Sequence, residues 1–150
     1  MKDGRGWIWI GAVLAGLAVA AGAFAAHGLD GYLKVKYEGQ TREVAGVAMP
    51  AAQKYLIDFK TAAEYQMYHA LALLAVGLLA CGGGSRRLTM AGASFLGGII
   101  LFSGCLYAIP LTGQRWLGAI VPIGGVLFLI GWAAFAAAVW RTPRNPSNSG

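Results

Sequence analysis

The chain has 150 residues, of which 57% are hydrophobic and 12% are charged, and it carries a net charge of +6. Soluble domains contain about 25% charged residues, so this composition argues against a water-soluble globule and predicts one membrane domain. The basic residues lie between apolar stretches and do not alternate with aromatic side chains, so no nucleic-acid partner is expected.

Four apolar stretches follow one another along the chain. They cover about residues 7–26, 61–82, 88–111 and 116–140. A membrane-spanning helix needs roughly 20 residues, and backbone groups in lipid must be paired within the segment. The sequence therefore predicts an all-α fold, a four-helix transmembrane bundle formed by a single domain over residues 1–141. The Pro-, Ser- and Asn-rich tail, residues 142–150, is expected to be disordered.

The first stretch has an alternative interpretation as a cleaved signal peptide, because Lys2 and Arg5 precede an apolar run that contains small-residue triplets. We favour a retained helix, since the run is long for a signal peptide and has small residues at helix-packing spacing. These rows are Ala12, Gly16, Ala20 and Ala18, Gly22, Ala26, with shorter rows at Ala93–Gly97, Ser94–Gly98 and Ala134–Ala138.

The longest extramembrane segment is the loop 28–60. Apolar and charged residues alternate at Leu33, Val35 and Tyr37, and the following EGQ sequence suggests a β-hairpin turn. From Pro50, apolar residues recur at helical spacing, with Lys54 and Asp58 placed as an i,i+4 pair. This part predicts an amphipathic helix at the outer membrane surface that leads into the second span.

Four spans place both termini on one side of the membrane. The two sides carry equal numbers of basic residues: Lys2, Arg5, Arg86, Arg87, Arg141 and Arg144 against Lys34, Lys36, Arg42, Lys54, Lys60 and Arg115. The first set lies in short segments near helix ends, where the positive-inside effect acts, so both termini are predicted to be cytoplasmic in a bacterial inner membrane. Trp7, Trp9 and Trp140 would then mark the inner interface, and Trp116 the outer one.

Polar residues begin the second span, in the sequence FKTAAEYQMYHALALL from Phe59 to Leu74. Ionisable side chains in a span are costly and need a structural reason or a function. The chain has two histidines, and both are predicted in the outer half of the bundle, where the third span adds further polar groups. The candidate polar cluster or ligand site comprises His27, Glu64, Tyr65, His69, Ser103, Cys105 and Tyr107.

Two interpretations of this cluster remain open. His27 and His69 lie on different helices, and such a pair binds a haem iron or a metal ion in some helical bundles. The alternative is structural: His69 and Tyr65 form hydrogen bonds across helices, and Glu64 reaches Lys60 or interfacial water. Two histidines without a third strong ligand are a weak metal signal, and the two cysteines form no metal-binding spacing.

Two prolines flank the connection between the third and fourth spans. Pro110 lies at the outer end of the third helix, whereas Pro122 is predicted inside the fourth helix, where it would kink it. A kinked helix beside Glu64 and His69 would suit a small transporter, but we favour the alternative that the kink only shapes the bundle. Phosphate-binding glycine loops, nucleophile elbows and HExxH motifs are absent from the sequence, so no enzymatic activity is indicated.

Four sequence blocks together resemble a known family. They are GAFAAHGL (22–29), FKTAAEYQMYHALALL (59–74), LFSGCLYAIPLTG (101–113) and WLGAIVPIGGVLFLIGW (116–132). This combination is similar to the domain of unknown function 423 family, whose eukaryotic relatives are the transmembrane protein 256 group. The resemblance implies a small four-helix integral membrane protein and brings no activity with it. Family members are expected to be shorter between His27 and Phe59 and to have glycine where this chain has Ala25.

Three functional hypotheses follow. The first is a non-enzymatic membrane protein that acts through interaction or small-ligand binding, with the lipid bilayer and a second copy or another membrane protein as partners. The second is a haem- or metal-binding redox protein that uses His27 and His69. The third is a small oligomeric transporter.

Overall fold

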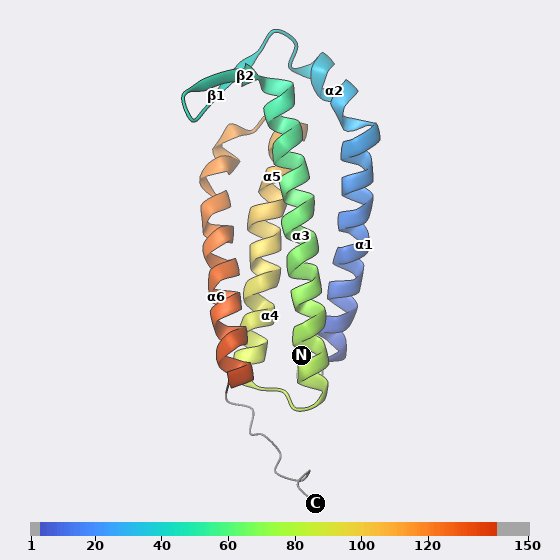
Figure 1. Cartoon of the computed structure of the whole chain (residues 1–150), viewed down its shortest axis with the longest axis vertical. Coiled ribbons are helices and arrows are strands. Elements are labelled where there is room, and N and C mark those ends of the chain that lie inside the picture. Colours follow the sequence, from blue (N-terminus) through green and yellow to red (C-terminus); the bar gives the residue numbers. More distant parts are fainter. Residues whose placement is uncertain (1–3, 141–150) are drawn as a thin grey trace, which may run out of the picture.

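Four long apolar helices stand side by side in the computed structural model, which describes residues 4–140 (Figure 1). They cover Arg5–His27, Ala51–Cys81, Arg86–Thr112 and Arg115–Trp140, and each is long and apolar enough to cross a membrane. The first helix begins and the last helix ends at the same end of the bundle (Figure 1). The predicted all-α four-helix fold is confirmed, whereas the predicted tail 142–150 lies outside the described residues.

Only the first two spans, α1 (Arg5–His27) and α3 (Ala51–Cys81), are single uninterrupted helices. The third span consists of α4 (Arg86–Gly98), a π-helical segment η1 (Ile99–Ser103) and α5 (Gly104–Thr112). A 3₁₀ turn, η2 (Arg115–Ala119), precedes the last helix, α6 (Val121–Trp140). The expected kink at Pro122 is wrong, because Pro122 is the second residue of α6, where its missing N–H removes no helical hydrogen bond.

Helix α1 packs along α3 through small residues spaced seven apart. Gly4, Gly11, Ala18 and Ala25 are buried. A β-carbon on Gly11 would lie 2.8 Å from the Ala70 carbonyl oxygen, so only glycine permits this approach of the two backbones. The predicted row Ala12, Gly16, Ala20 is exposed instead, which corrects the sequence interpretation. The sequence of one helix does not show which of its rows of small residues contacts a neighbouring helix.

One apolar cluster in the half of the bundle nearer the two termini joins all four spans. Leu73, Val76, Phe95 and Phe128 belong to it, and Trp7 of α1 packs against α4 at Gly92. Trp7 is therefore a core residue, not a membrane-interface residue as predicted. Trp9, Trp116 and Trp140 are exposed, as interfacial tryptophans need to be.

The end of the bundle opposite the two termini, which we call the outer end after its predicted orientation, carries a short helix and a two-stranded hairpin. Helix α2 (Leu29–Lys36) follows α1, and strands β1 (Thr41–Val44) and β2 (Val47–Pro50) pair antiparallel around Ala45 and Gly46, which both have positive φ (Figure 1). The hairpin is thus displaced from its predicted start at Leu33. Leu33 and Tyr37 are four residues apart and both are buried, as expected on one face of a helix. The alternation of apolar and charged residues that predicted a strand here is therefore compatible with a helix as well.

The predicted helix after Pro50 forms, but it is the first part of α3 and continues without interruption into the second span. Its buried face, with Tyr55 and Phe59, joins Leu29, Leu33 and Tyr37 in a second apolar cluster at the outer end. Lys54 and Asp58 form the predicted ion pair, with a distance of 2.5 Å. The loop 28–60 is therefore an ordered cap over the outer end of the bundle.

Candidate functional site

His69 lies buried among aromatic side chains of two other spans. Its ring stacks on Phe128 with centroids 3.4 Å apart and planes 7° apart, and Phe95 and Trp132 lie at 5.6 and 6.1 Å. Only 4% of His69 is exposed. The ring therefore fills a packing position between α3, α4 and α6.

Both ring nitrogens of His69 have hydrogen-bond partners. The Trp132 indole nitrogen lies 3.2 Å from Nε2, and the Tyr65 carbonyl oxygen lies 2.7 Å from Nδ1. An indole N–H can only donate, so Nε2 must accept and the proton sits on Nδ1, which donates to the carbonyl. His69 is thus a neutral tautomer fixed by two hydrogen bonds, and a metal ion could bind it only by displacing one of them.

His27 lies far from His69, at the end of α1. Gly4, the residue before α1, lies against Gly77 of α3, Gly11 lies against Ala70, and the Gln66 amide donates to the Leu14 carbonyl. Extending this antiparallel register places His27 level with the turn around Lys54, about 15 residues and about 22 Å from His69. A single metal or haem iron cannot bind both, so the predicted His27–His69 ligand pair is wrong. Among residues 4–140, no group of three or more His, Cys, Asp or Glu side chains could hold a metal ion.

Tyr65 and Glu64 do not form the polar centre expected of them. The Tyr65 ring stacks on Phe102, with ring centroids 4.8 Å apart. Tyr65 accepts the hydrogen bond from His69 through its backbone oxygen, not through its hydroxyl. Glu64 is exposed and makes no ion pair with Lys60, since the two ion pairs found between residues 4 and 140 involve other side chains. The transport path proposed beside Glu64, His69 and a kink at Pro122 is not supported by this arrangement.

The third span contributes three polar side chains, Ser103 from η1 and Cys105 and Tyr107 from α5. Ser103 is fully buried, Cys105 is buried, and the hydroxyl oxygens of Ser103 and Tyr107 lack hydrogen-bond partners within the described part of the chain. Tyr107 packs against Phe59, with ring centroids 4.7 Å apart.

The predicted seven-residue cluster is therefore not one site. His27 lies at the α1–α2 corner, and Tyr65 and His69 belong to the α3–α4–α6 aromatic layer. Glu64 is exposed on α3, and Ser103, Cys105 and Tyr107 belong to η1 and α5.

A pocket that sequence reasoning missed lies at the outer end of the bundle. It has a volume of about 390 Å³ and lies between the hairpin, the first turns of α3, α5 and the η2 turn. Its charged lining residues are Arg42, Glu43, Lys54, Asp58 and Arg115. Leu106, Ile109 and Val121 form its apolar wall. This size is in the usual range for small-molecule sites.

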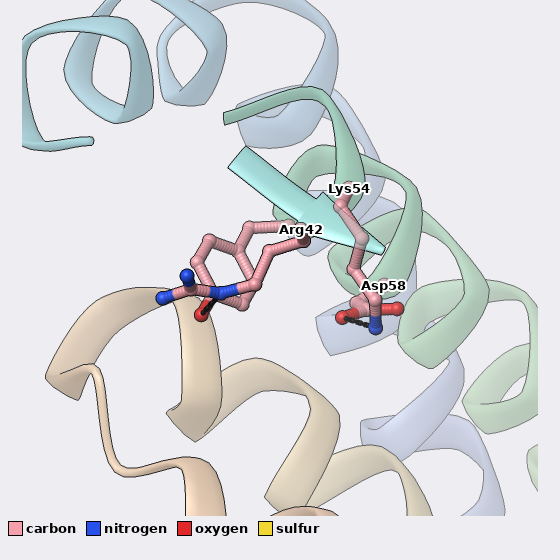
Figure 2. A network of polar contacts seen from close by, with 4 residues as sticks. Arg42, Lys54 and Asp58 are labelled. Carbon is pink, nitrogen blue, oxygen red and sulfur yellow. Dashed lines mark hydrogen bonds and ion pairs between the residues drawn. The ribbon is translucent and has the colours of Figure 1, made fainter. Parts of the chain in front are cut away.

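Two groups of polar contacts hold the pocket's side chains in place. The Arg42 Nε donates to the Tyr55 hydroxyl at 3.0 Å, with the guanidinium 5.6 Å from the ring centre, while Lys54 pairs with Asp58 (Figure 2). Arg115 has no ion-pair partner among residues 4–140. Because Lys54 and Asp58 neutralise each other, two arginines face a single further carboxylate, that of Glu43, and the pocket keeps a positive balance.

Tyr37 connects the cap to the third span beside this pocket. Its hydroxyl donates to the Pro110 carbonyl at 2.9 Å, and its ring lies 4.6 Å from that of Tyr55. Burial raises the pKa of Tyr37 above its usual value, and the neighbouring Lys36 opposes this shift. Tyr37 therefore stays protonated and helps to hold Tyr55, which positions Arg42.

The sequence offered few signals for this pocket. The Lys54–Asp58 pair was predicted, but Arg42 and Arg115 are 73 positions apart and were interpreted only as topology signals. Their convergence depends on the hairpin folding over the connection between α5 and α6.

The fold defines this chain as a four-span integral membrane protein whose outer end is covered by an ordered cap. The chain belongs to the family described as "Protein of unknown function (DUF423)", whose model matches residues 21–125. The resemblance seen in the sequence is thereby confirmed.

Curated relatives share this membrane character. The chain is 43% identical over 135 residues to the UPF0382 membrane protein SERP0230 of Staphylococcus epidermidis, covering 90% of this chain and 95% of that protein. It is 42% identical over 133 residues to the UPF0382 membrane protein YwdK of Bacillus subtilis, covering 88% and 94%. A UPF0382 membrane protein of Haemophilus influenzae is 40% identical over 125 residues, covering 83% and 85%. No solved structure matches the chain.

The family match runs through the loop between His27 and Phe59. That relatives are shorter in this loop stays a prediction, because the shares of the two chains that align do not place any gap.

Proposed function

We propose that this protein is a non-enzymatic membrane protein that binds a small anionic ligand in the pocket at its outer end. The observation that carries the proposal is the positive pocket of about 390 Å³ formed by the cap, α3, α5 and η2. Guanidinium groups bind carboxylates and phosphates through paired hydrogen bonds, and Arg42 is already oriented by Tyr55. The apolar wall suits an organic ligand that carries the anionic group.

Binding is tested on the full chain in detergent micelles. Inorganic phosphate, succinate and benzoate serve as probes, and the thermal midpoint of unfolding is recorded against probe concentration. At least one probe is expected to raise the thermal midpoint in a saturable way. Arg42→Gln and Arg115→Gln should each lower the affinity for that probe about tenfold, while Arg86→Gln at the opposite end should leave the affinity unchanged. Equal responses in all four proteins, or no saturable response, would reject the proposal.

The membrane topology belongs to the same proposal. We place the chain in a bacterial inner membrane with both termini in the cytoplasm, which puts the pocket outside. Arg86 and Arg87 are the first two residues of α4, directly after the short connection from α3 and at the same end as Arg5, which supports this orientation. Single cysteines near residue 84 and in the hairpin, introduced into a variant without Cys81 and Cys105, test it. A membrane-impermeant maleimide should label intact cells only at the hairpin, and the reverse pattern would contradict the topology.

A second copy of the chain, or another membrane protein, is proposed as a partner for the outward face of α1. The row Ala12, Gly16, Ala20 is exposed, and a β-carbon on Gly16 would meet nothing within 4 Å in the described part of the chain. Gly16→Leu should therefore weaken self-association in lipid vesicles, measured by energy transfer between labelled copies, without lowering helix content. Unchanged association would exclude a second copy on this face.

A further inference from the structure

A second concavity lies within the spans, separate from the outer pocket. It is an apolar groove of about 360 Å³ between three helices, lined by Leu14, Leu17 and Ala21 of α1, Phe59 and Gln66 of α3, and Tyr107 and Leu111 of α5. The Gln66 amide is already engaged, since it donates to the Leu14 carbonyl at 2.8 Å. The groove is open to its surroundings, which along the spans are the acyl chains of the bilayer.

One wall of the groove contains a polar atom without a partner. The Tyr107 hydroxyl oxygen is buried and makes no hydrogen bond within residues 4–140. A hydroxyl without a hydrogen-bond partner is unfavourable in hydrocarbon, where no water can replace the partner, so an acceptor at this point would be favourable. Leu111 lies one helical turn beyond Tyr107, lines the same groove and is 42% exposed, so its side chain has room to move aside for such an acceptor.

The outer end of the groove carries a cation. The Lys36 ammonium donates to the carbonyl oxygen of Leu111, a groove residue, and lies 5.4 and 5.5 Å from the ring centres of Tyr32 and Tyr37. Lys36 has no carboxylate partner among the described residues, whereas Lys34 is paired with Asp30. A negatively charged group above the groove would therefore meet an ammonium that no carboxylate of this region neutralises.

The order of these groups matches the order of groups in a phospholipid. Tyr107 lies five residues before the end of α5, about 8 Å along the helix, which is close to the thickness of one headgroup region. From outside to inside, the groove thus presents a cation, a hydroxyl and an apolar channel. We propose that it binds one anionic glycerophospholipid, with the phosphate at Lys36, an ester carbonyl accepting from Tyr107, and one acyl chain along Leu14, Leu17 and Ala21.

The test measures lipid retained by the full chain in detergent micelles, by native mass spectrometry with added palmitoyl-oleoyl phosphatidylglycerol. Wild-type protein should retain one lipid, and phosphatidylcholine should bind more weakly. Ala21→Phe, which fills the groove, should reduce retention at least tenfold, while its matched control Ala20→Phe, on the exposed face of α1, should not. Equal retention by Ala21→Phe and Ala20→Phe would overturn the proposal.

Two milder variants keep the test decisive if Ala21→Phe fails to fold. Tyr107→Phe keeps the ring contact with Phe59 and should reduce retention about fivefold, against no change for the exposed control Tyr68→Phe. Lys36→Gln should remove the preference for phosphatidylglycerol over phosphatidylcholine. If both variants retain lipid as the wild type does, the proposal is wrong. Arg42→Gln should leave lipid retention unchanged, so the groove and the outer pocket can fail independently.

Discussion

The two sides of α3 pack against their neighbours in different ways. Toward α1, glycines allow the two backbones to touch, as at Gly11 and Gly77. Toward α4 and α6, large rings fill the space, with His69 stacked on Phe128 and tilted against Phe95. Within lipid there is little hydrophobic driving force between helices, so both sides depend on close van der Waals contact. The glycine side excludes any added atom, whereas the aromatic side depends on hydrogen bonds that hold one ring in place.

The largest effect is expected on the glycine side. A β-carbon on Gly77 would lie 2.7 Å from the Gly4 carbonyl oxygen and 2.8 Å from the Ile8 nitrogen, and these backbone atoms cannot move aside singly. Gly77→Leu should lower the free energy of unfolding by more than about 3 kcal/mol, the upper end for overpacking. Unfolding in dodecyl sulphate, followed by circular dichroism, measures this. Gly22→Leu is the control, since a β-carbon there would meet nothing within 4 Å, and equal losses in the two variants would refute a tight α1–α3 contact.

The aromatic side should respond next. His69→Ala removes a stacked ring and leaves the Trp132 indole without its acceptor, so a loss of about 3 kcal/mol is expected. The same unfolding titration measures it. Elemental analysis and the absorption spectrum should be identical for wild type and variant. A metal or haem signal that disappears in the variant would show that His69 is a ligand and not a packing residue.

A smaller change isolates the hydrogen bond. Trp132→Phe keeps an aromatic ring beside Phe95 but removes the donor to His69, leaving Nε2 buried and unpaired. The expected loss is about 2 kcal/mol. The double variant with His69→Ala should lose less than the sum of the two single losses. Strict additivity would mean that the two side chains do not interact, contrary to their 3.2 Å contact.

The smallest effect is expected in the cap, which is held neither by glycine contacts nor by stacked rings alone. Tyr37→Phe removes the hydrogen bond to Pro110 and should cost about 1 kcal/mol at neutral pH. The pKa of Tyr37 is raised in the folded protein, so the unfolded chain releases this proton first, near pH 10, and stability should fall as the pH rises above that value. Thermal midpoints between pH 8 and 11 should show a weaker alkaline decline in Tyr37→Phe than in the exposed control Tyr32→Phe. Identical pH profiles for the two variants would exclude this role of Tyr37.

The sequence by itself determined the four spans, the class of protein and the family, because these depend on properties carried along the chain. A run of roughly 20 apolar residues must be helical in lipid whatever surrounds it, and the four sequence blocks resemble the family without reference to contacts. The Lys54–Asp58 pair was predictable for the same reason, since both residues lie on one helix face.

Only the tertiary structure decided which residues meet. His27 and His69 both belong to the outer half by sequence, yet the antiparallel register of α1 on α3 separates them by about 22 Å. Arg42 and Arg115 share a pocket only because the hairpin lies over the α5–α6 connection. The Tyr107 hydroxyl lacks a partner only because of what surrounds it. Helical periodicity fixes the direction of a side chain within its own helix, but the rotation and register of each helix against the next are set by packing, which the linear sequence does not display.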